Sequence, residues 1–548
     1  MGTGTDPPIE PAHPRWRHAA LRPLAVPVFR RFWIASMVSN FGTMMHGVAA
    51  AWLMTSLSTG VEMVAMVQTA ATLPMMLFSV PAGALADIVD RRRIMIYAQV
   101  GMALVTTTLC LTTVGGWTTP AVLLAATFLV ATGNALYAPA WQASVAEQVS
   151  LRLLDSATSL TSVGFNVARS IGPAIGGLLV ATVGSGPVFG LNALSNIGIV
   201  AASLSWRREP SEPPLPPEGM REAVAAGLRY ASLSPRLITL LVRSSSFGFC
   251  GSCVWALTPV LSRDALGGGP ISLGLLLGGF GLGAIFGAVL RTNLSISIAT
   301  LLGRCTLIAG AATIALSLSP STWLAIPLMA LNGACWIMVL TSLSVSVQMI
   351  VPRWVVGRMI SINQMSVFAG MAGGSLLWGV VARHAGVRYA FFAAGAAMVA
   401  SLVLQRWFPL WSATNLDLTP RRTTPIDTLE GPVAATEGPI VITIEYRVPP
   451  ASAGDFMEAM EALGRVRRRD GAKRWSLQQD LEDGERWVER FVSASWISHL
   501  RRQMRPTFAD QETSDRVAAL HLGPPVVRRA IERSRNAPAA SSYRVPDY

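Results

Sequence analysis

Charged residues are scarce in this chain, and acidic residues are scarcest where it is most apolar. Only 14% of the 548 residues are charged, against about a quarter in an average soluble protein. No Asp or Glu occurs between Asp264 and Asp417, whereas 19 of the 31 acidic residues lie after residue 410. This distribution excludes a wholly soluble chain and indicates a membrane part followed by a soluble tail.

Residues that could hold a metal or a cofactor are also few. Cys250 and Cys253 have the C-x-x-C spacing, but they lie in an apolar run without a second Cys or His pair, so we interpret them as packing residues. We therefore expect no cofactor and no metal. The net charge of +13 is spread over loops and tail rather than one patch, which does not favour nucleic acid as a partner. Residues 1–31 lack the apolar core of a signal peptide.

Apolar runs dominate the first three quarters of the chain. A helix of about 20 apolar residues crosses a bilayer, and twelve such runs are predicted. They cover residues 32–56, 63–86, 94–115, 120–146, 157–183, 187–206, 236–261, 270–291, 296–318, 322–348, 357–382 and 387–409. The predicted fold is an all-α membrane protein of twelve transmembrane helices in two six-helix halves, followed by a small α+β domain.

The arginines predict the orientation of these spans. An even number of spans places both termini on one side. Seventeen arginines lie in the segments on that side, and only Arg263, Arg383 and Arg388 lie in loops on the other. Because basic residues are retained on the cytoplasmic side, both termini are predicted to be cytoplasmic, in a bacterial inner membrane.

A weak internal repeat supports two halves. Residues 149–160 align without gaps on residues 351–362, and the same offset of 202 places Gly172 on Gly374 and Gly184 on Gly386. The predicted organisation is an N-terminal segment (1–31), a first bundle (32–206), a central cytoplasmic loop with an amphipathic stretch near its end (207–235), a second bundle (236–409), a linker (410–438), a soluble α+β domain (439–535) and a tail (536–548).

A polar turn, Pro81 to Arg93, lies between the second and third runs. Within it Gly83, Asp87, Arg91 and Arg92 match the pattern G-x-x-x-D-R-x-G-R-[RK], whereas Ile88 and Asp90 depart from it. Together with Gly-Pro-Ala-Ile-Gly-Gly at 172–177, this turn resembles the major facilitator superfamily. More narrowly, the chain resembles its enterobactin-exporter-like "transmembrane secretion effector" branch, over essentially its whole length.

The resemblance implies an alternating-access transporter whose halves rock about a central site. The Gly-Pro run is similar to a motif of exporters; ordinary small-residue packing is the alternative. If the second span packs against the eleventh, Asp87 would face Arg358 and close the cytoplasmic side; otherwise Asp87 is a solvated loop acid. The predicted gating residues are Gly83, Asp87, Asp90, Arg91, Arg92, Arg93, Gly172, Pro173, Gly176, Gly177 and Arg358.

Polar groups inside spans are costly and are therefore functional candidates. Arg169, halfway along the fifth span, needs a carboxylate, helix carbonyls, water or an anionic ligand. His46, in the first span, titrates near neutral pH and is a candidate proton carrier, or else a neutral residue of the cavity. Arg243 and Arg304 lie near cytoplasmic ends and can snorkel.

In the superfamily that the chain resembles, the first, fourth, seventh and tenth spans line the central cavity. This implies a broad apolar and aromatic wall with scattered amides, which suits a bulky amphipathic organic ligand better than a sugar. The residues concerned are Asn40, Met44, Met45, Asn134, Tyr137, Trp141, Gln142, Phe249, Trp255, Asn332, Trp336 and Gln348.

The tail changes to a soluble pattern. Strands are predicted at 440–448, 474–481 and 486–492, helices at 451–468 and 495–505, and a last strand near 516–521. This order predicts a ferredoxin-like fold, and the tail resembles an antibiotic-biosynthesis-monooxygenase-like domain. Such domains pair through their sheets, which implies a homodimer contact or a regulatory role; haem or oxidase chemistry at Trp496 and His499 is the alternative.

The sequence as a whole predicts a proton-coupled exporter of small organic molecules, such as siderophores, drugs or secondary metabolites, rather than an enzyme. A membrane-anchored sensor or assembly protein that positions the tail is the alternative. An enzyme with a membrane anchor, which would rest on the tail alone, is a third.

Overall fold

Long α-helices make up most of the chain, as its apolar runs predict. The computed structural model describes residues 16–58, 60–206, 220–294, 296–352, 354–410, 437–503 and 507–533. The helical part consists of η1 (Trp16–Ala25), α1 (Pro27–Leu57), α2 (Val61–Ile88), α3 (Arg91–Val114), α4 (Pro120–Gln148), η2 (Leu151–Leu153), α5 (Leu154–Val183), α6 (Ser185–Ser205), α7 (Met220–Ser232), α8 (Pro235–Val260), η3 (Leu261–Ala265), α9 (Pro270–Asn293), α10 (Ile298–Leu318), α11 (Thr322–Ile350), α12 (Val356–Ala385), α13 (Val387–Ala400), η4 (Ser401–Val403) and α14 (Leu404–Trp407).

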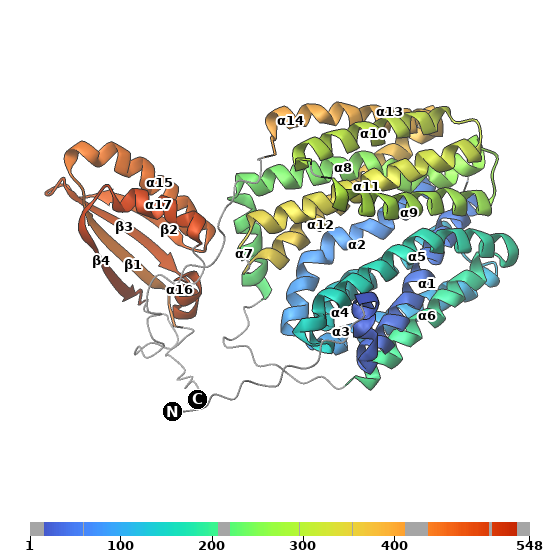
Figure 1. Cartoon of the computed structure of the whole chain (residues 1–548), viewed down its shortest axis with the longest axis horizontal. Helices are drawn as coiled ribbons and strands as arrows, with labels where there is room; N and C mark the ends of the chain where they lie inside the picture. The colour runs from blue at the N-terminus through green and yellow to red at the C-terminus, as the bar shows by residue number, and fades with distance from the viewer. Residues whose placement is uncertain are drawn as a thin grey trace.

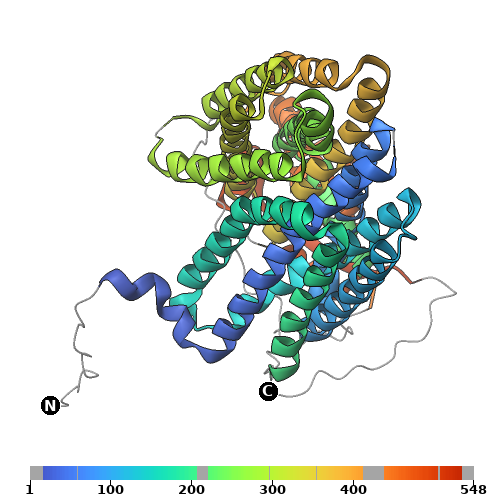
Figure 2. The same ribbon diagram turned by 90° about the vertical axis from the view of Figure 1, so that its right-hand side faces the viewer.

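Successive long helices run back and forth between two ends of the helical part (Figure 1). We call the end next to α7 and the α2–α3 turn the α7 end, and the opposite one, with the α1–α2, α5–α6 and α12–α13 turns, the far end. Viewed from the far end, α1–α6 and α8–α13 form two bundles side by side (Figure 2). We call them the first and the second bundle.

Eleven helical segments within the described residues are long and apolar enough to cross a membrane: α2 to α6, α8 with η3, α9 to α12, and α13 continued through α14. The 31-residue helix α1 falls outside this set. Polar residues such as Asn40 and His46 lower its hydropathy. The structure thus has a mostly helical, multi-pass architecture.

The packing within one bundle is repeated in the other. In the first bundle α3 packs on α6, α2 packs on α4 and α1 packs on α5. In the second bundle the corresponding pairs are α10 with α13, α9 with α11 and α8 with α12. Each helix of the second bundle therefore has a counterpart six spans earlier. This is the arrangement that internal repeats of transporters produce.

Two glycine pairs show the same repeat at the level of single residues. Gly184 and Gly386, 202 positions apart, both have positive φ (83° and 91°) in the tight turns α5–α6 and α12–α13, a conformation that favours glycine. A side chain at Gly172 would collide with Met44 of α1, and one at Gly374 with the Phe249 carbonyl of α8. The weak sequence repeat thus corresponds to a repeat in structure.

The soluble domain is a four-stranded antiparallel sheet covered by helices on one face (Figure 1). Its elements are β1 (Ile440–Arg447), η5 (Pro450–Ser452), α15 (Ala453–Arg469), β2 (Lys473–Gln479), β3 (Arg486–Ser493), α16 (Trp496–Gln503), α17 (Phe508–Ala518) and β4 (Leu522–Ile531), and the strand order is β2-β3-β1-β4. Alternate residues of β1 and β3 pack under α15 and α16, among them Ile442, Tyr446 and Phe491.

The predicted last strand near residues 516–521 is wrong. Residues 516–518 end α17, and residues 519–521 follow it. The helix begins at a capping box in which Thr507 and Asp510 bind each other's backbone N–H groups. The strand is β4, which starts at Leu522 and contains Pro524 and Pro525. Proline is tolerated there because β4 lies at the edge of the sheet.

A buried ion-pair network fixes α15 on the sheet. Glu489 is fully buried and accepts hydrogen bonds from Trp475 Nε1 at 2.8 Å, Tyr446 Oη at 3.0 Å and Arg467 Nε at 3.4 Å. Although burial alone lowers the pKa of Arg467, the Glu489 carboxylate raises it above its ordinary value. The charge is thus paired inside the core, as a buried ion requires.

Candidate functional site

The two bundles meet along two seams. One is formed by α2 and α12, the other by α5 and α9. In the order of the spans these pairs are the second with the eleventh and the fifth with the eighth, so the repeat exchanges one seam for the other. Any movement of one bundle against the other must open contacts along these seams.

The α5–α9 seam is built from backbone. Gly177 of α5 lies so close to α9 that an added methyl group would stand 2.9 Å from Gly274 Cα, and one at Gly274 would stand 2.8 Å from the Pro173 carbonyl oxygen. Nearer the middle, a methyl group at Gly281 would overlap the backbone of Ser170. The helices can approach this closely only because glycines face each other.

The Gly-Pro run at 172–177 makes packing contacts in two directions. Gly177 packs on the other bundle, whereas Gly172 and Gly176 pack on Met44 and Met45 of α1 in their own bundle. Pro173 lies inside α5 and contributes its carbonyl to the seam with α9. The run therefore packs α5 against both bundles at once.

The α2–α12 seam is bridged by side chains at several levels, and one glycine, Gly379, packs closely on Ala65. At the far end Arg383 Nη1 lies 3.1 Å from Glu62 Oε1. In the middle the hydroxyls of Thr69 and Ser375 are hydrogen-bonded at 2.7 Å. Toward the α7 end Gly83 faces Ser361, whose Oγ would lie 3.5 Å from an added methyl group. Gly83 thus meets a side chain at ordinary contact distance and not a helix backbone.

A further cross-bundle contact closes the far end. The guanidinium of Arg263, in η3 of the second bundle, donates through Nη1 to the carbonyl of Thr55 in α1 and through Nε to Asp264 at 2.6 Å. Together with the Glu62–Arg383 pair, it ties the two bundles at the far end in this conformation.

The arginines of the α2–α3 turn bind within the first bundle. Arg91 donates to the carbonyls of Ala86 and Ala143, both at 3.2 Å, and to Glu147 Oε1 at 2.6 Å, so it joins α2, α3 and α4. Arg92 donates to the last carbonyls of α6, those of Ser203 and Leu204, at 2.8 Å each.

The remaining members of the turn have different surroundings. Asp90 caps α3 by accepting from the Arg92 N–H at 2.9 Å, and Arg93 is exposed. The side chain of Asp87 lies outside what the structure describes, so its predicted pairing with Arg358 has no geometry here. Arg358 itself lies beside α7, its Cβ 3.5 Å from where a Cβ at Gly227 would stand.

Arg169 and His46 are among the side chains within the bundles that carry shielded, unpaired polar atoms. Arg169 of α5 is half-buried, and its Nε and Nη2 atoms are shielded from solvent without a hydrogen-bond partner. His46 of α1 is buried, with neither ring nitrogen bonded, and its ring lies 4.9 Å from that of Phe189 in α6. His46 thus faces a helix of its own bundle.

The predicted cavity residues separate into several groups. Trp255 and Trp336 come together with Phe280 inside the second bundle, with ring centroids 4.7 to 6.5 Å apart. Tyr137 stacks on Trp141 at 6.3 Å in the first. Asn332 is buried and accepts from Thr313 Oγ1 at 3.1 Å. Phe249 contacts Trp378. The side chains of Met44 and Met45 lie against α5. Asn40 and Asn134 are half-buried, whereas Gln142 and Gln348 are exposed.

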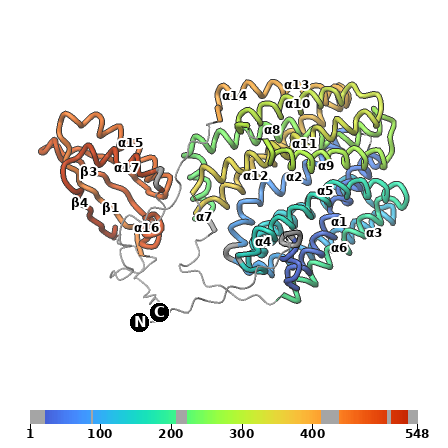
Figure 3. Tube along the Cα trace, in the orientation of Figure 1, coloured from blue at the N-terminus to red at the C-terminus, as the bar shows by residue number. Residues whose placement is uncertain are grey.

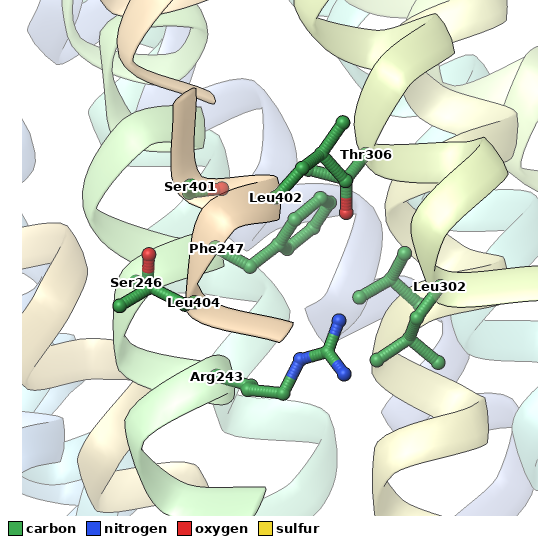
Figure 4. A pocket seen from close by; sticks show the side chains of 9 residues that line it. Arg243, Ser246, Phe247, Leu302, Thr306, Ser401, Leu402 and Leu404 are labelled. Atoms are coloured by element: carbon green, nitrogen blue, oxygen red, sulfur yellow. The ribbon is translucent and has the colours of Figure 1, made fainter. Parts of the chain in front are cut away.

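A small cavity lies inside the second bundle at its α7 end (Figure 4). Its lining includes Arg243 and Phe247 of α8, Leu302 of α10 and Ser401 of η4. The Arg243 guanidinium points from α8 toward Leu302. Because the cavity lies within one bundle, it is not on either seam.

No three His, Cys, Asp or Glu side chains within the described ranges are grouped so that they could hold a metal ion. The seams are held by non-covalent contacts that can be broken and re-formed. These are an exposed ion pair, a buried hydroxyl pair and glycine packing. Two repeat-related helical bundles with such seams define the class of multi-pass membrane transporters.

The family match agrees with this class. The model of the transmembrane secretion effector family, of major facilitator (MFS) type, matches residues 18–537. The chain belongs to this family.

Relatives and solved structures agree with this assignment. The chain is 26% identical over 396 residues to the multidrug efflux pump Tap of Mycolicibacterium fortuitum, covering 68% of this chain and 94% of that protein. It is 28% identical over 208 residues to Tap of Mycobacterium tuberculosis strain H37Rv, covering 36% and 49%.

Solved structures with the same fold include an inward-facing, unoccupied bacterial homologue of the lysosomal transporter Spinster (TM-score 0.53, 18% identity, 72% of this chain and 96% of that one). A POT family transporter in complex with 5-aminolevulinic acid is similar too (TM-score 0.57, 14% identity, 71% and 96%).

Sequence reasoning missed the cross-bundle residues Glu62, Arg263 and Arg383. The two arginines were assigned to outer loops by position alone. One signal was available: Glu62 is the only acidic residue before Asp87 outside the N-terminal segment, and an isolated acid at the start of a span calls for a partner.

Proposed function

We propose that this protein is a secondary transporter that exports small, drug-like organic molecules from the cytoplasm by alternating access. The observation that carries this proposal is the pair of seams that the internal repeat exchanges. One seam is glycine backbone and suits a pivot. The other is made of individually weak side-chain contacts and suits a gate.

The substrate class follows from the relatives and from the bundle interiors. The Tap proteins bear the name multidrug efflux pump, and the aromatic groups around Trp255 and Tyr137 offer apolar surface rather than the dense amides that a sugar needs. Arg169 would contribute one positive charge, which favours molecules with a carboxylate or another anionic group. Siderophores and secondary metabolites belong to the same chemical range.

The orientation is proposed from the arginines. The α7 end, with Arg91–Arg93 and Arg358, would face the cytoplasm, and both termini would lie there. In this arrangement α1 also crosses the membrane and brings the number of spans to twelve, and the protein lies in a bacterial inner membrane. The lower hydropathy of α1 is compatible with crossing the membrane, because the polar side chains of Ser39, Asn40 and His46 are buried or half-buried.

Proton coupling is proposed to involve His46, the one histidine of α1. Its unbonded ring nitrogens leave it able to accept a proton when the bundles move. Replacing His46 with Gln should flatten the dependence of efflux on external pH while leaving folding intact. An unchanged pH profile would remove His46 from the mechanism.

The cytoplasmic gate is proposed to include Asp87 and Arg358. Asp87 ends α2 and Arg358 begins α12, and these helices share a seam. Reversing both charges together (Asp87→Arg with Arg358→Asp) should restore much of the transport lost on reversing either one. A double variant no better than the singles would reject the pairing.

The soluble domain is proposed to be ferredoxin-like. Its βαββαβ order and its β4-β1-β3-β2 antiparallel sheet are the features of that fold. The exposed valines of β4, Val526 and Val527, provide a surface through which two copies could pair. The alternative function, a membrane-anchored protein that positions this domain, would make the bundles a static scaffold.

Everted membrane vesicles test the proposal directly. Uptake of a panel of dyes, siderophores and antibiotics is measured with and without a pH gradient, against vesicles without the protein. Transport of at least one compound that collapses when the gradient is dissipated supports a coupled exporter. Binding without accumulation across the panel would favour the scaffold alternative.

A further inference from the structure

Helix α7 lies across the α2–α12 seam. It packs on both α2 and α12, and Figure 3 places it between the helical part and the soluble domain. The contact with α12 is close: a methyl group at Gly227 would stand within 3.6 Å of the side chains of Arg358, Met359 and Ile362. If α2 and α12 part at this end, α7 must lose its contacts with one of them.

Tyr230 of α7 is the point at which three parts of the chain meet. It is only 3% exposed, although α7 is outside the membrane-spanning set. Its ring packs edge-on against Trp354, at the start of α12, with centroids 5.7 Å apart. The guanidinium carbon of Arg469, at the end of α15 in the soluble domain, lies 5.1 Å from the centroid of the same ring.

Arg469 is held in place by its own domain. Its Nε donates to Asp470 Oδ1 at 3.0 Å, and its Nη2 donates to both carboxylate oxygens of Asp510 at 2.9 and 3.0 Å. Asp510 is fixed in turn by the capping box with Thr507. The guanidinium therefore needs no reordering to stack on the ring, which keeps most of the cation–π attraction as net stabilisation.

The ring is suited to this contact. Burial raises the pKa of the Tyr230 phenol above its ordinary value, and the charge of Arg469 opposes that shift. The phenol thus stays neutral at physiological pH. A desolvated cation–π pair is stronger than an exposed one, and the Arg469 side chain is only 17% exposed.

We propose that the soluble domain is a latch on the transporter: by stacking Arg469 on Tyr230 it holds α7 across α2 and α12 and keeps the α7 end of this seam closed. Whatever moves the domain, such as a ligand or a second copy, would then control access to the pathway. Control of access rests on the transport function proposed above, whereas closure of the seam is a property of the helices themselves.

The test measures opening of the seam without a substrate. Ser361→Cys, opposite Gly83, is alkylated by a membrane-impermeant maleimide added at the α7 end of the full-length protein, in vesicles whose orientation has been determined. Arg469→Ala and Tyr230→Leu should each raise the alkylation rate about three- to tenfold, the range that a cation–π contact supports. The double variant should be no faster than the faster single variant, because both remove one contact.

Matched controls separate the latch from a damaged fold. Tyr230→Phe keeps the ring and should leave the rate unchanged, as should Arg465→Ala, which removes an exposed arginine from the same helix. Rates unaltered by Arg469→Ala or by Tyr230→Leu, or effects that multiply in the double variant, would overturn the proposal. So would an effect of Arg465→Ala equal to that of Arg469→Ala, which would show a general charge effect.

Discussion

The two seams that join the bundles are related by the internal repeat, yet they are built differently. Along α5–α9, Gly177, Gly274 and Gly281 bring backbone against backbone. Along α2–α12, a hydroxyl pair and an ion pair bridge the helices. Symmetry of fold therefore does not impose symmetry of contact.

The difference indicates how the movement is divided. Backbone packing gains its energy from many small contacts and is lost steeply with separation, so α5–α9 resists opening and suits a pivot. Single hydrogen bonds and exposed ion pairs exchange readily with water at a net cost of about 1 kcal/mol or less each. The α2–α12 seam is thus the one that can open and close repeatedly.

The largest expected effect comes from adding one methyl group to the pivot. Gly281→Ala should destabilise the protein by about 1 to 3 kcal/mol, because the methyl group overlaps the Ser170 backbone. Gly83→Ala, on the other seam, meets only Ser361 Oγ at 3.5 Å and should be nearly neutral. Thermal unfolding in detergent measures both. Equal losses would erase the distinction between the seams.

The next effect concerns the hydrogen bonds of Arg91, which hold three helices of the first bundle together. Arg91→Ala removes three hydrogen bonds that join α2, α3 and α4 and should cost about 2 kcal/mol. The control is Arg93→Ala, two residues away and exposed, which should change the unfolding temperature little. An Arg93 variant as unstable as the Arg91 variant would show that the turn needs positive charge rather than these bonds.

A smaller effect is expected at the middle of the gate. Thr69→Val removes the buried bond to Ser375, worth about 1 kcal/mol, and should speed alkylation of a cysteine at position 361 about fivefold. Thr72→Val is the matched control, since its hydroxyl donates only to carbonyls of α2 itself. If both variants open the seam equally, the cross-bundle bond is not part of the gate.

The smallest effect is expected at the far end. The side chains of Glu62 and Arg383 are 26% and 60% exposed, so their ion pair is worth about 0.5 kcal/mol. Reversing either charge should speed alkylation of Ala65→Cys from that side about twofold, and exchanging both should restore the original rate. An effect that persists in 1 M salt would contradict an electrostatic origin.

The sequence predicted the layout well where the physical signal is local. Apolar length marked the long helices to within a few residues, and the offset between Gly184 and Gly386 anticipated two equivalent turns. Both signals arise from simple requirements, namely bilayer thickness and a positive φ. The last strand was predicted near 516–521 instead of at β4, because β4 contains prolines that are tolerated only at a sheet edge, and the sequence does not show which strand is at the edge.

The site was less predictable because contacts between distant helices leave little local trace. Gly172 and Gly177 look alike in sequence, yet one faces α1 and the other α9, five residues being about one and a half helical turns. Arg91 and Arg92 were expected to work at the gate, but their partners lie within the first bundle. The stacking of Arg469 on Tyr230 joins residues more than two hundred positions apart.

If the bundles rock against each other, the two ends of the pathway open in turn. Spin labels at Arg93 and Gly357 report the width of the α7 end, and labels at Trp117 and Tyr389 report the far end, in the same protein under opposite pH gradients. Rocking bundles should respond to a gradient that lengthens one distance by shortening the other. Distances that stay fixed, or that lengthen together, would contradict this rocking movement.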